Sequence, residues 1–357
     1  MLQQMKTKSF VGLLACIIAT SIIVCLYGDP KPSIHEIVTE THRQLSQLKK
    51  LKVVAPVQKD PVPEERYLKS LGFTDNPRLF PTNVWNNVSL PVFVTAVASG
   101  DSELTIEFIK SHQHCFPNHV LLIYDIGLDT EEFLLVHKFC NYTNCTIRKF
   151  NFDNYPSHVS NLKLFAHRPI IIQEVLDQAG AVIWMDVNFK IISSQIDGVL
   201  QKAQKERLVS WSIDQPTSTL THPKMFDYFQ TRQDNFYFHR MVEPSHILLY
   251  NTGLIHQHLM LPWVQCALTP DCIAPIGAQS SGCRFDKKPL YRYSGCHRYD
   301  MSALNVILGI MFDYTNCYVA SNEDKFFQKV EERLENENMQ KDNTTSMVHE
   351  VVQMKNA

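Results

Sequence analysis

Apolar residues from position 90 onward come in short runs, and amphipathic stretches of helix length separate these runs. The runs cover residues 91–98, 120–124, 181–185, 208–213 and 247–250, and residues 146–150 alternate between apolar and polar. Runs that are apolar at almost every position predict strands buried on both faces, whereas alternation predicts a strand at the edge of a sheet. We therefore expect an α/β fold, in which helices cover both faces of a mostly parallel sheet.

Two helices have clear signals in the sequence. Pro169 suits the first turn of a helix, and Gly180 is a suitable residue to end it. Residues 303, 304, 307, 308, 311 and 312 are apolar at helical spacing, which predicts a second helix with a buried face. Asp300 or Ser302 is expected to cap the N-terminus of this second helix.

The longest apolar run lies near the N-terminus, at residues 10–27, and carries no charge. Its length is close to that of a helix that spans a membrane. Lys6 and Lys8 precede the run and Asp29 follows it, so the positive-inside rule predicts a type II signal anchor. A cleaved signal peptide is the alternative, but its apolar core is normally about 7–15 residues long and the cleavage site here is poor.

These patterns divide the chain into five predicted segments. They are a cytosolic tail (1–9), a transmembrane anchor (10–27), a stem (28–89), a folded lumenal domain (90–322) and an acidic, polar tail (323–357). The stem is rich in proline and charge. It is either a flexible or partly helical spacer or an ordered extension that packs on the core, and the sequence leaves both alternatives open.

Two features that do not depend on hydropathy favour a lumenal location, in the ER or the Golgi. Acceptor triplets for N-glycosylation follow the anchor at Asn87, Asn141, Asn144 and Asn343. Eight cysteines also follow it, and an even number on the lumenal side predicts disulfides. Cys266/Cys272 and Cys283/Cys296 are the first pairs to expect, because they are close in the sequence. The folded part is therefore predicted to be a disulfide-bonded glycoprotein.

Several classes of function are disfavoured. The chain has 34 basic and 36 acidic residues and no basic stripe, which argues against a nucleic-acid partner. No GxGxxG motif follows the first predicted strand, so a dehydrogenase or methyltransferase on a Rossmann sheet is a weak alternative. No GxSxG motif is present either, which disfavours a hydrolase of that type.

Acidic residues follow the predicted strands, where ligands bind in parallel sheets. Asp101, Asp125 and Asp186 all lie at or just after strand ends, and Asn188 lies on the same side of an extended chain as Asp186. Transfer of a sugar from a nucleotide donor requires that the charge of the diphosphate be neutralised. A divalent metal held by carboxylates after a strand commonly does this.

Three segments carry a resemblance to a known pattern. The strand ending in Trp184-Met185-Asp186, the run from Tyr250 to Leu254 and the segment RYDMSALNVIL at 298–308 together resemble GT-A glycosyltransferases. More closely, residues 90–320 resemble DUF1647, a nematode-expanded family of uncharacterised type II membrane proteins that is regarded as glycosyltransferase-like. The resemblance implies a GT-A-like sheet and a nucleotide-sugar donor.

The resemblance also implies a metal site and two catalytic residues. Asp186 matches the first aspartate of the DXD metal motif, and Asn188 stands at the position of the second. Because an amide is a weaker ligand than a carboxylate, Mn²⁺ or Mg²⁺ would be held weakly or be absent. Asp300 is expected near the acceptor hydroxyl, so Asp186 and Asp300 are the catalytic candidates. Asp300 has a helix cap as its structural alternative.

Further residues are implied to bind the donor and acceptor. Ser99 and Asp125 would face the nucleotide, and Asn251 would line the sugar or acceptor site. Ser99 has a helix cap as its structural alternative, and Asn251 has a turn before Gly253. Arginines at 284, 292 and 298 could hold a diphosphate without a metal.

The leading hypothesis is a Golgi or ER glycosyltransferase that moves a sugar from a nucleotide-sugar donor to a glycan or protein acceptor. The alternative is a non-catalytic lumenal protein on the same fold, which binds a glycan or acts as a scaffold. Asn188 is the main support for this alternative.

Overall fold

The computed structural model describes residues 63–74, 79, 90–286 and 288–330. Its centre is a six-stranded sheet in the order β3-β2-β1-β4-β7-β6. The strands are β1 (Val92–Val97), β2 (Leu121–Asp125), β3 (Cys145–Lys149), β4 (Ala181–Met185), β6 (Leu208–Pro216) and β7 (Arg240–Tyr250). The first four are parallel, whereas β7 is antiparallel to both β4 and β6. The predicted mostly parallel sheet, with β3 at its edge, is thus confirmed.

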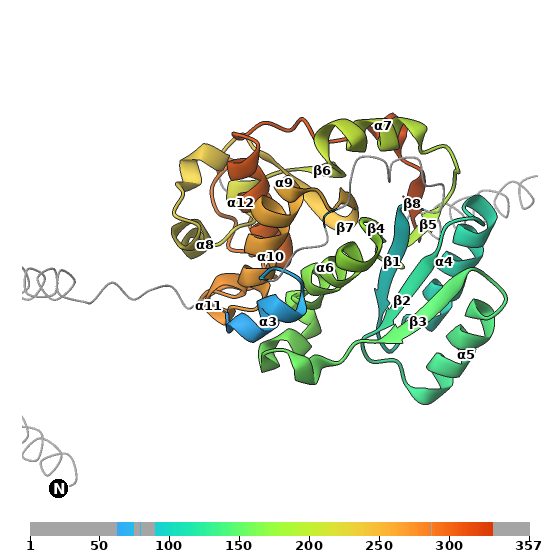
Figure 1. Ribbon diagram of the computed structural model, residues 1–357. Coiled ribbons are helices and arrows are strands. Elements are labelled where there is room, and N and C mark those ends of the chain that lie inside the picture. The colour runs from blue at the N-terminus through green and yellow to red at the C-terminus, as the bar shows by residue number, and fades with distance from the viewer. Residues whose placement is uncertain (1–62, 75–78, 80–89, 287, 331–357) are drawn as a thin grey trace, which may run out of the picture. The chain divides into compact units, whose positions relative to one another are not determined.

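Helices cover both faces of this sheet (Figure 1). Side chains such as Val94 and Trp184 point to one face, where they share a core with α6 (His167–Ala179), α10 (Leu261–Ala267) and α12 (Asp300–Met311). Their neighbours Phe93 and Ile183 point to the other face, where the core includes α4 (Ser102–Cys115), α5 (Thr130–Cys140) and α7 (Asp197–Glu206). Burial on both faces explains why these strands are apolar at successive positions.

The remaining elements are short. They are α3 (Glu65–Ser70), α8 (Pro223–Tyr228), α9 (Gly253–Ile255), α11 (Pro270–Ile273), the π-helical turn His256–Met260, the strands β5 (Phe189–Ile191) and β8 (Phe327–Lys329), and 3₁₀ turns at Phe152–Asn154, Ser157–Ser160, Leu162–Leu164, Thr217–Thr219, Gln233–Phe236 and Asn322–Asp324. Strands β5 and β8 pair antiparallel in a small second sheet.

Helix α6 begins and ends as its sequence predicts. Pro169 lies in its first turn, where a missing N–H costs nothing. Gly180 follows its last residue with φ 83°, and its N–H donates to the carbonyl of Leu176. A left-handed glycine is a common helix end because it has no Cβ to clash. This start places Arg168, the second residue of α6, beside the end of β4.

The N-terminus of α12 differs from the prediction. Asp300 is its first residue, but neither Asp300 nor Ser302 caps the helix. The Asp300 carboxylate instead accepts a hydrogen bond from Arg168, and the Ser302 hydroxyl donates to the carbonyl of Leu220. Asn305 fixes α12 on β7, because its amide group bonds both the N–H and the carbonyl of Val242.

Two ordered elements lie inside segments that were predicted to be a stem and a tail. Helix α3 falls within the predicted stem, yet Tyr67, Leu68 and Leu71 are buried in the core that contains α6. Gln173 of α6 also donates to the Leu71 carbonyl. This part of the stem is therefore an ordered extension. Phe327 of β8 is likewise buried, although it follows the predicted domain end at residue 322.

Three disulfides form among the described cysteines. Cys266–Cys272 and Cys283–Cys296 confirm the two predicted pairs, and Cys140–Cys145 links the end of α5 to the start of β3. Cys115 and Cys317 are free thiols, so the even number of cysteines does not correspond to complete pairing.

The predicted anchor at residues 10–27 lies outside the described residues. Within the described part of the chain, no helix is both long enough and apolar enough to cross a membrane.

Candidate functional site

A cleft of about 810 Å³ opens at the carboxyl ends of β1 and β4. Parallel sheets bind ligands at this edge, because the loops that follow the strands meet there. The lining combines apolar and charged side chains. It consists of Ala96, Ala98, Asp101, Leu104, Ile126, Leu162, Lys163, Phe165, His167, Arg168, Trp184, Asp186, Val187, Asn188, Ser280, Ser281, Arg298 and Tyr299.

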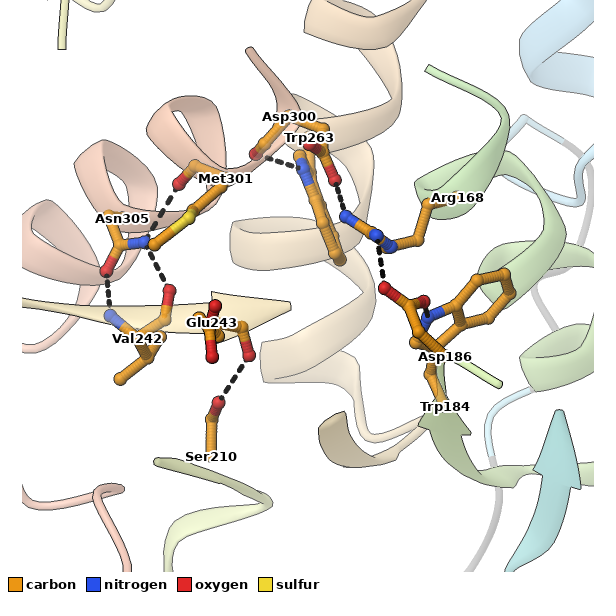
Figure 2. Close-up of polar contacts among 10 residues, drawn as sticks. All are labelled: Arg168, Trp184, Asp186, Ser210, Val242, Glu243, Trp263, Asp300, Met301 and Asn305. Carbon is orange, nitrogen blue, oxygen red and sulfur yellow. Dashed lines mark hydrogen bonds and ion pairs between the residues drawn. The ribbon is translucent and has the colours of Figure 1, made fainter. Parts of the chain in front are cut away.

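Arg168 joins the two acids that the sequence predicted to be catalytic. Figure 2 shows its guanidinium between the carboxylates of Asp186 and Asp300. One amino group lies 2.9 Å from Asp186 Oδ2 and the other 2.5 Å from Asp300 Oδ2. The second Asp186 oxygen accepts a 2.7 Å hydrogen bond from the Trp184 indole. Both oxygens of Asp186 therefore have partners within the protein.

Burial sets the charges of this bridge. Arg168 and Asp300 are 4% and 1% exposed, whereas the Asp186 side chain keeps 26% of its surface. Burial raises the pKa of Asp300 to about 6 against the opposing effect of Arg168. Burial also raises the pKa of Asp186, and Arg168 again opposes it. Burial lowers the pKa of Arg168, but the combined effect of the two carboxylates is larger and raises this pKa above its usual value. The guanidinium therefore stays charged.

Of the two catalytic candidates, only Asp186 lines the cleft. Asp300 lies behind the wall, where its carboxylate bonds Arg168 and its carbonyl accepts from the Trp263 indole. Asp300 thus does not line the cleft in this structure, and its approach to an acceptor stays a prediction. Asn188 also lines the cleft, but its side-chain oxygen is buried and has no hydrogen-bond partner among the described residues.

Ser99 and Asp125 lie close to the cleft without lining it. Asp125 Oδ1 accepts hydrogen bonds from the N–H groups of Gly127 and Leu128, so this carboxylate holds the turn after β2. The N–H of Ser99 donates to the Gly127 carbonyl across the same pair of loops. Their sequence neighbours Ala98 and Ile126 face the cleft instead.

Asn251 lies at the amino ends of the parallel strands, whereas the cleft lies at their carboxyl ends. Strand β7 runs antiparallel to β4, so its last residue, Tyr250, pairs with Ala181 at the start of β4. The Asn251 N–H donates to the Gly180 carbonyl there, and its side chain is fully buried. Asn251 therefore does not line the cleft in this structure, because β7 runs antiparallel to β4.

The residues at the predicted metal site do not fit a resident Mn²⁺ or Mg²⁺. Such ions require several oxygen ligands that are free to bind them. One oxygen of Asp186 lies 2.9 Å from the Arg168 cation, which would repel a metal, and the other accepts a hydrogen bond from the Trp184 indole. The Asn188 oxygen is buried. No group of three His, Cys, Asp or Glu side chains with metal-binding geometry occurs among the described residues.

Three cleft residues escaped prediction from sequence. Arg168 and Lys163 belong to no charge pattern, and Phe165 stacks on the Arg168 guanidinium at 4.6 Å. Among the three arginines considered from sequence, Arg298 lines the cleft and the other two do not. A useful signal was available for Arg168, since it directly precedes the proline that marks the start of a helix.

Comparison with protein families gives one match. Residues 66–173 match the model of DUF1647, which is described as a protein of unknown function. The match covers 108 of the 357 residues. The resemblance was predicted for residues 90–320 and is confirmed over residues 90–173, whereas the match itself begins earlier, at residue 66. No curated protein matches the sequence.

Several solved glycosyltransferases share part of this arrangement. The galactosyltransferase LgtC, solved with donor and acceptor sugar analogues, is 12% identical over 48% of this chain and 61% of its own, with a TM-score of 0.32. Core-mannan synthase A from Aspergillus fumigatus, in its Mn/GDP form, is 9% identical over 66% of this chain and 73% of its own, with a TM-score of 0.42. Mouse xyloside xylosyltransferase 1 is 8% identical over 62% and 82%, with a TM-score of 0.35.

These likenesses are partial. The chain spans about three-fifths of the length of LgtC, and all three TM-scores lie below 0.5. They are too low to transfer an activity from those proteins to this chain. Its function has to be argued from its own cleft.

Proposed function

We propose that this DUF1647 chain is a glycosyltransferase that transfers a sugar from a nucleotide-sugar donor to a glycan or protein acceptor. The observation that carries the proposal is the position of Asp186. This partly exposed carboxylate follows β4 and faces a large cleft at the carboxyl edge of a mostly parallel sheet. The GT-A-like sequence around Asp186 supports the same assignment.

The lining suits a ligand with one apolar part and one charged part. Ala96, Ala98, Leu104 and Ile126 give the cleft an apolar section near β1 and β2, which suits a nucleoside. Charged side chains in the same cleft suit phosphates and sugar hydroxyls. A nucleotide sugar combines these two chemical characters in one molecule.

Asp186 would act on the sugar. Trp184 and Arg168 hold its carboxylate in one orientation, and each carboxylate oxygen can still accept a further hydrogen bond. Asp186 can therefore bind a sugar hydroxyl without changing its orientation. Polar groups that are already oriented stabilise a transition state best, because no energy is spent on reorganising them. Asp300 would serve as a positioning residue, because it reaches the cleft only through Arg168.

The proposal places this activity in the ER or Golgi, on the lumenal side of a membrane crossed by residues 10–27. The charge-free run at these residues, the flanking lysines and the glycosylation triplets support that location. Three disulfides among the described residues agree with an oxidising compartment.

The test is a transfer assay with the full-length chain, kept in detergent, against a panel of UDP, GDP and CMP sugars and glycan acceptors. We expect release of the nucleotide with one donor. Asp186→Asn should lower kcat/KM roughly 100-fold or more, since the amide cannot supply the fixed negative charge. Asp153→Asn, an exposed position outside the cleft, is the matched control. Absence of nucleotide release with every member of the panel would remove the proposed function.

One observation favours a second candidate, a lumenal binding protein without catalysis. Arg168 forms ion pairs with both acids, and Asn188 stands where the metal motif has a carboxylate. Such a protein would bind a nucleotide sugar or glycan but release no nucleotide, and Asp186→Ala would leave its biological role intact. The transfer assay separates the two candidates.

A further inference from the structure

Two cations enter the cleft from opposite parts of the sequence. Lys163 lies in the 3₁₀ turn Leu162–Leu164 just before α6, and Arg298 lies in the loop just before α12. The Arg298 N–H is held by the Leu220 carbonyl and the Ser302 hydroxyl, so the backbone that carries this side chain is fixed. Both side chains thus line one cleft, and the backbone at Arg298 is fixed.

Neither cation has an acidic partner among the described residues. The ion pairs of the cleft belong to Arg168 alone. The Arg298 guanidinium makes one long hydrogen bond, 3.5 Å to the Ser280 carbonyl, and Ser280 also lines the cleft. Cations without partners on a cleft wall can bind an anionic ligand, whereas the Arg168 cation is already neutralised.

The backbone is strained beside both cations. Phe165 and Tyr299 have φ angles of 52° and 45°, a left-handed region that side chains other than glycine rarely adopt. Both aromatic residues line the cleft. Phe165 lies two residues before the start of α6, and Tyr299 directly precedes the start of α12. Strain of this kind is usually retained where a site requires an exact geometry.

We propose that Lys163 and Arg298 bind the diphosphate of the donor and that this binding requires no divalent metal. The inference rests on the proposed function, since it names how the same cleft would hold its substrate. It has two observations behind it. The ligand atoms around Asp186 do not suit Mn²⁺, and two cations in the same cleft can supply the positive charge that the metal would have brought.

The experiment measures binding of UDP and of GDP to the full-length chain by calorimetry, with EDTA and separately with Mn²⁺. We expect one nucleotide to bind with the same Kd under both conditions. Lys163→Met and Arg298→Met should each weaken binding roughly tenfold or more, because each removes a charge-assisted contact with phosphate. Lys138→Met and Arg292→Met, which replace exposed cations outside the cleft, are matched controls.

The outcomes separate this inference from the function on which it rests. Binding that appears only with Mn²⁺, or binding that both cleft variants retain in EDTA, would overturn the inference and leave the transferase proposal standing. Absence of binding to both nucleotides under all conditions would overturn the inference itself, and the sugar panel would then decide the function. Melting temperatures of the four variants confirm that each is folded, since all four side chains reach solvent.

Discussion

At the scale of single residues, Arg168 has two roles. It pairs with the buried Asp300, and it orients Asp186 in the cleft. Replacement by methionine should destabilise the protein by roughly 3–5 kcal/mol, because Asp300 would remain buried without an opposite charge beside it. The midpoint of urea unfolding would report the loss.

The double variant Arg168→Met with Asp300→Asn is the informative control. It removes the buried carboxylate as well, so it should be more stable than Arg168→Met alone. If the single and double variants unfold at the same urea concentration, the buried bridge does not determine this stability. The exposed-position variant Arg292→Met should unfold like the wild type.

The same residue shows where prediction from sequence ends. Arg168 meets Asp186 across 18 positions and Asp300 across 132 positions. The position of Asp186 could be predicted, because a carboxylate that directly follows a strand of a parallel sheet lies at the carboxyl ends of the strands, where ligands bind. The bridge from Asp186 through Arg168 to Asp300 could not be predicted, because it depends on how the starts of α6 and α12 pack against β4.

At the scale of elements, helix α3 is expected to be part of the folding unit. Leu71→Ala should lower the free energy of unfolding by about 2–4 kcal/mol, since this side chain is 1% exposed in the core shared with α6. Leu134→Ala on α5 is the control, because 61% of that side chain is exposed and its loss should cost less than about 0.5 kcal/mol. Equal stability of the two variants in urea would show that α3 does not contribute.

Elements differed in how well their sequence predicted them. The strands were found because they are buried on both faces and thus form short apolar runs, as in residues 181–185. The sequence left open whether the segment that contains α3 is ordered, because proline and charge dominate the composition around a short buried stretch. The direction of β7 was not predicted, since an apolar run carries no information about the direction of the chain, and Asn251 at the end of β7 does not line the cleft.

At the scale of the whole molecule, the apolar layers on both sides of the sheet contain several neutral histidines. Burial lowers the pKa of His112, His167, His246 and His297 to about 3 and that of His239 to about 4. The unfolded chain would bind protons at these sites near pH 6.5, whereas the folded chain would not. Stability from these groups is therefore present above pH 6.5 and is lost as the pH falls towards 3. Burial raises the pKa of Glu174 and Glu243, and these carboxyls act in the opposite direction.

One histidine isolates this contribution. His112 of α4 is 1% exposed and lies outside the cleft, against the rings of Phe93 and Phe116. In the wild type, its share of the stability should fall by about 1.4 kcal/mol for each pH unit below 6.5. His112→Leu should remove that share, so its unfolding free energy, measured in urea between pH 7.5 and 5, should depend less steeply on pH than the wild-type value. His114→Leu, at an exposed position of the same helix, is the matched control. Parallel pH profiles for the wild type and His112→Leu would contradict the assignment of a neutral imidazole to the core, because only a group that stays unprotonated in the folded state can produce this slope.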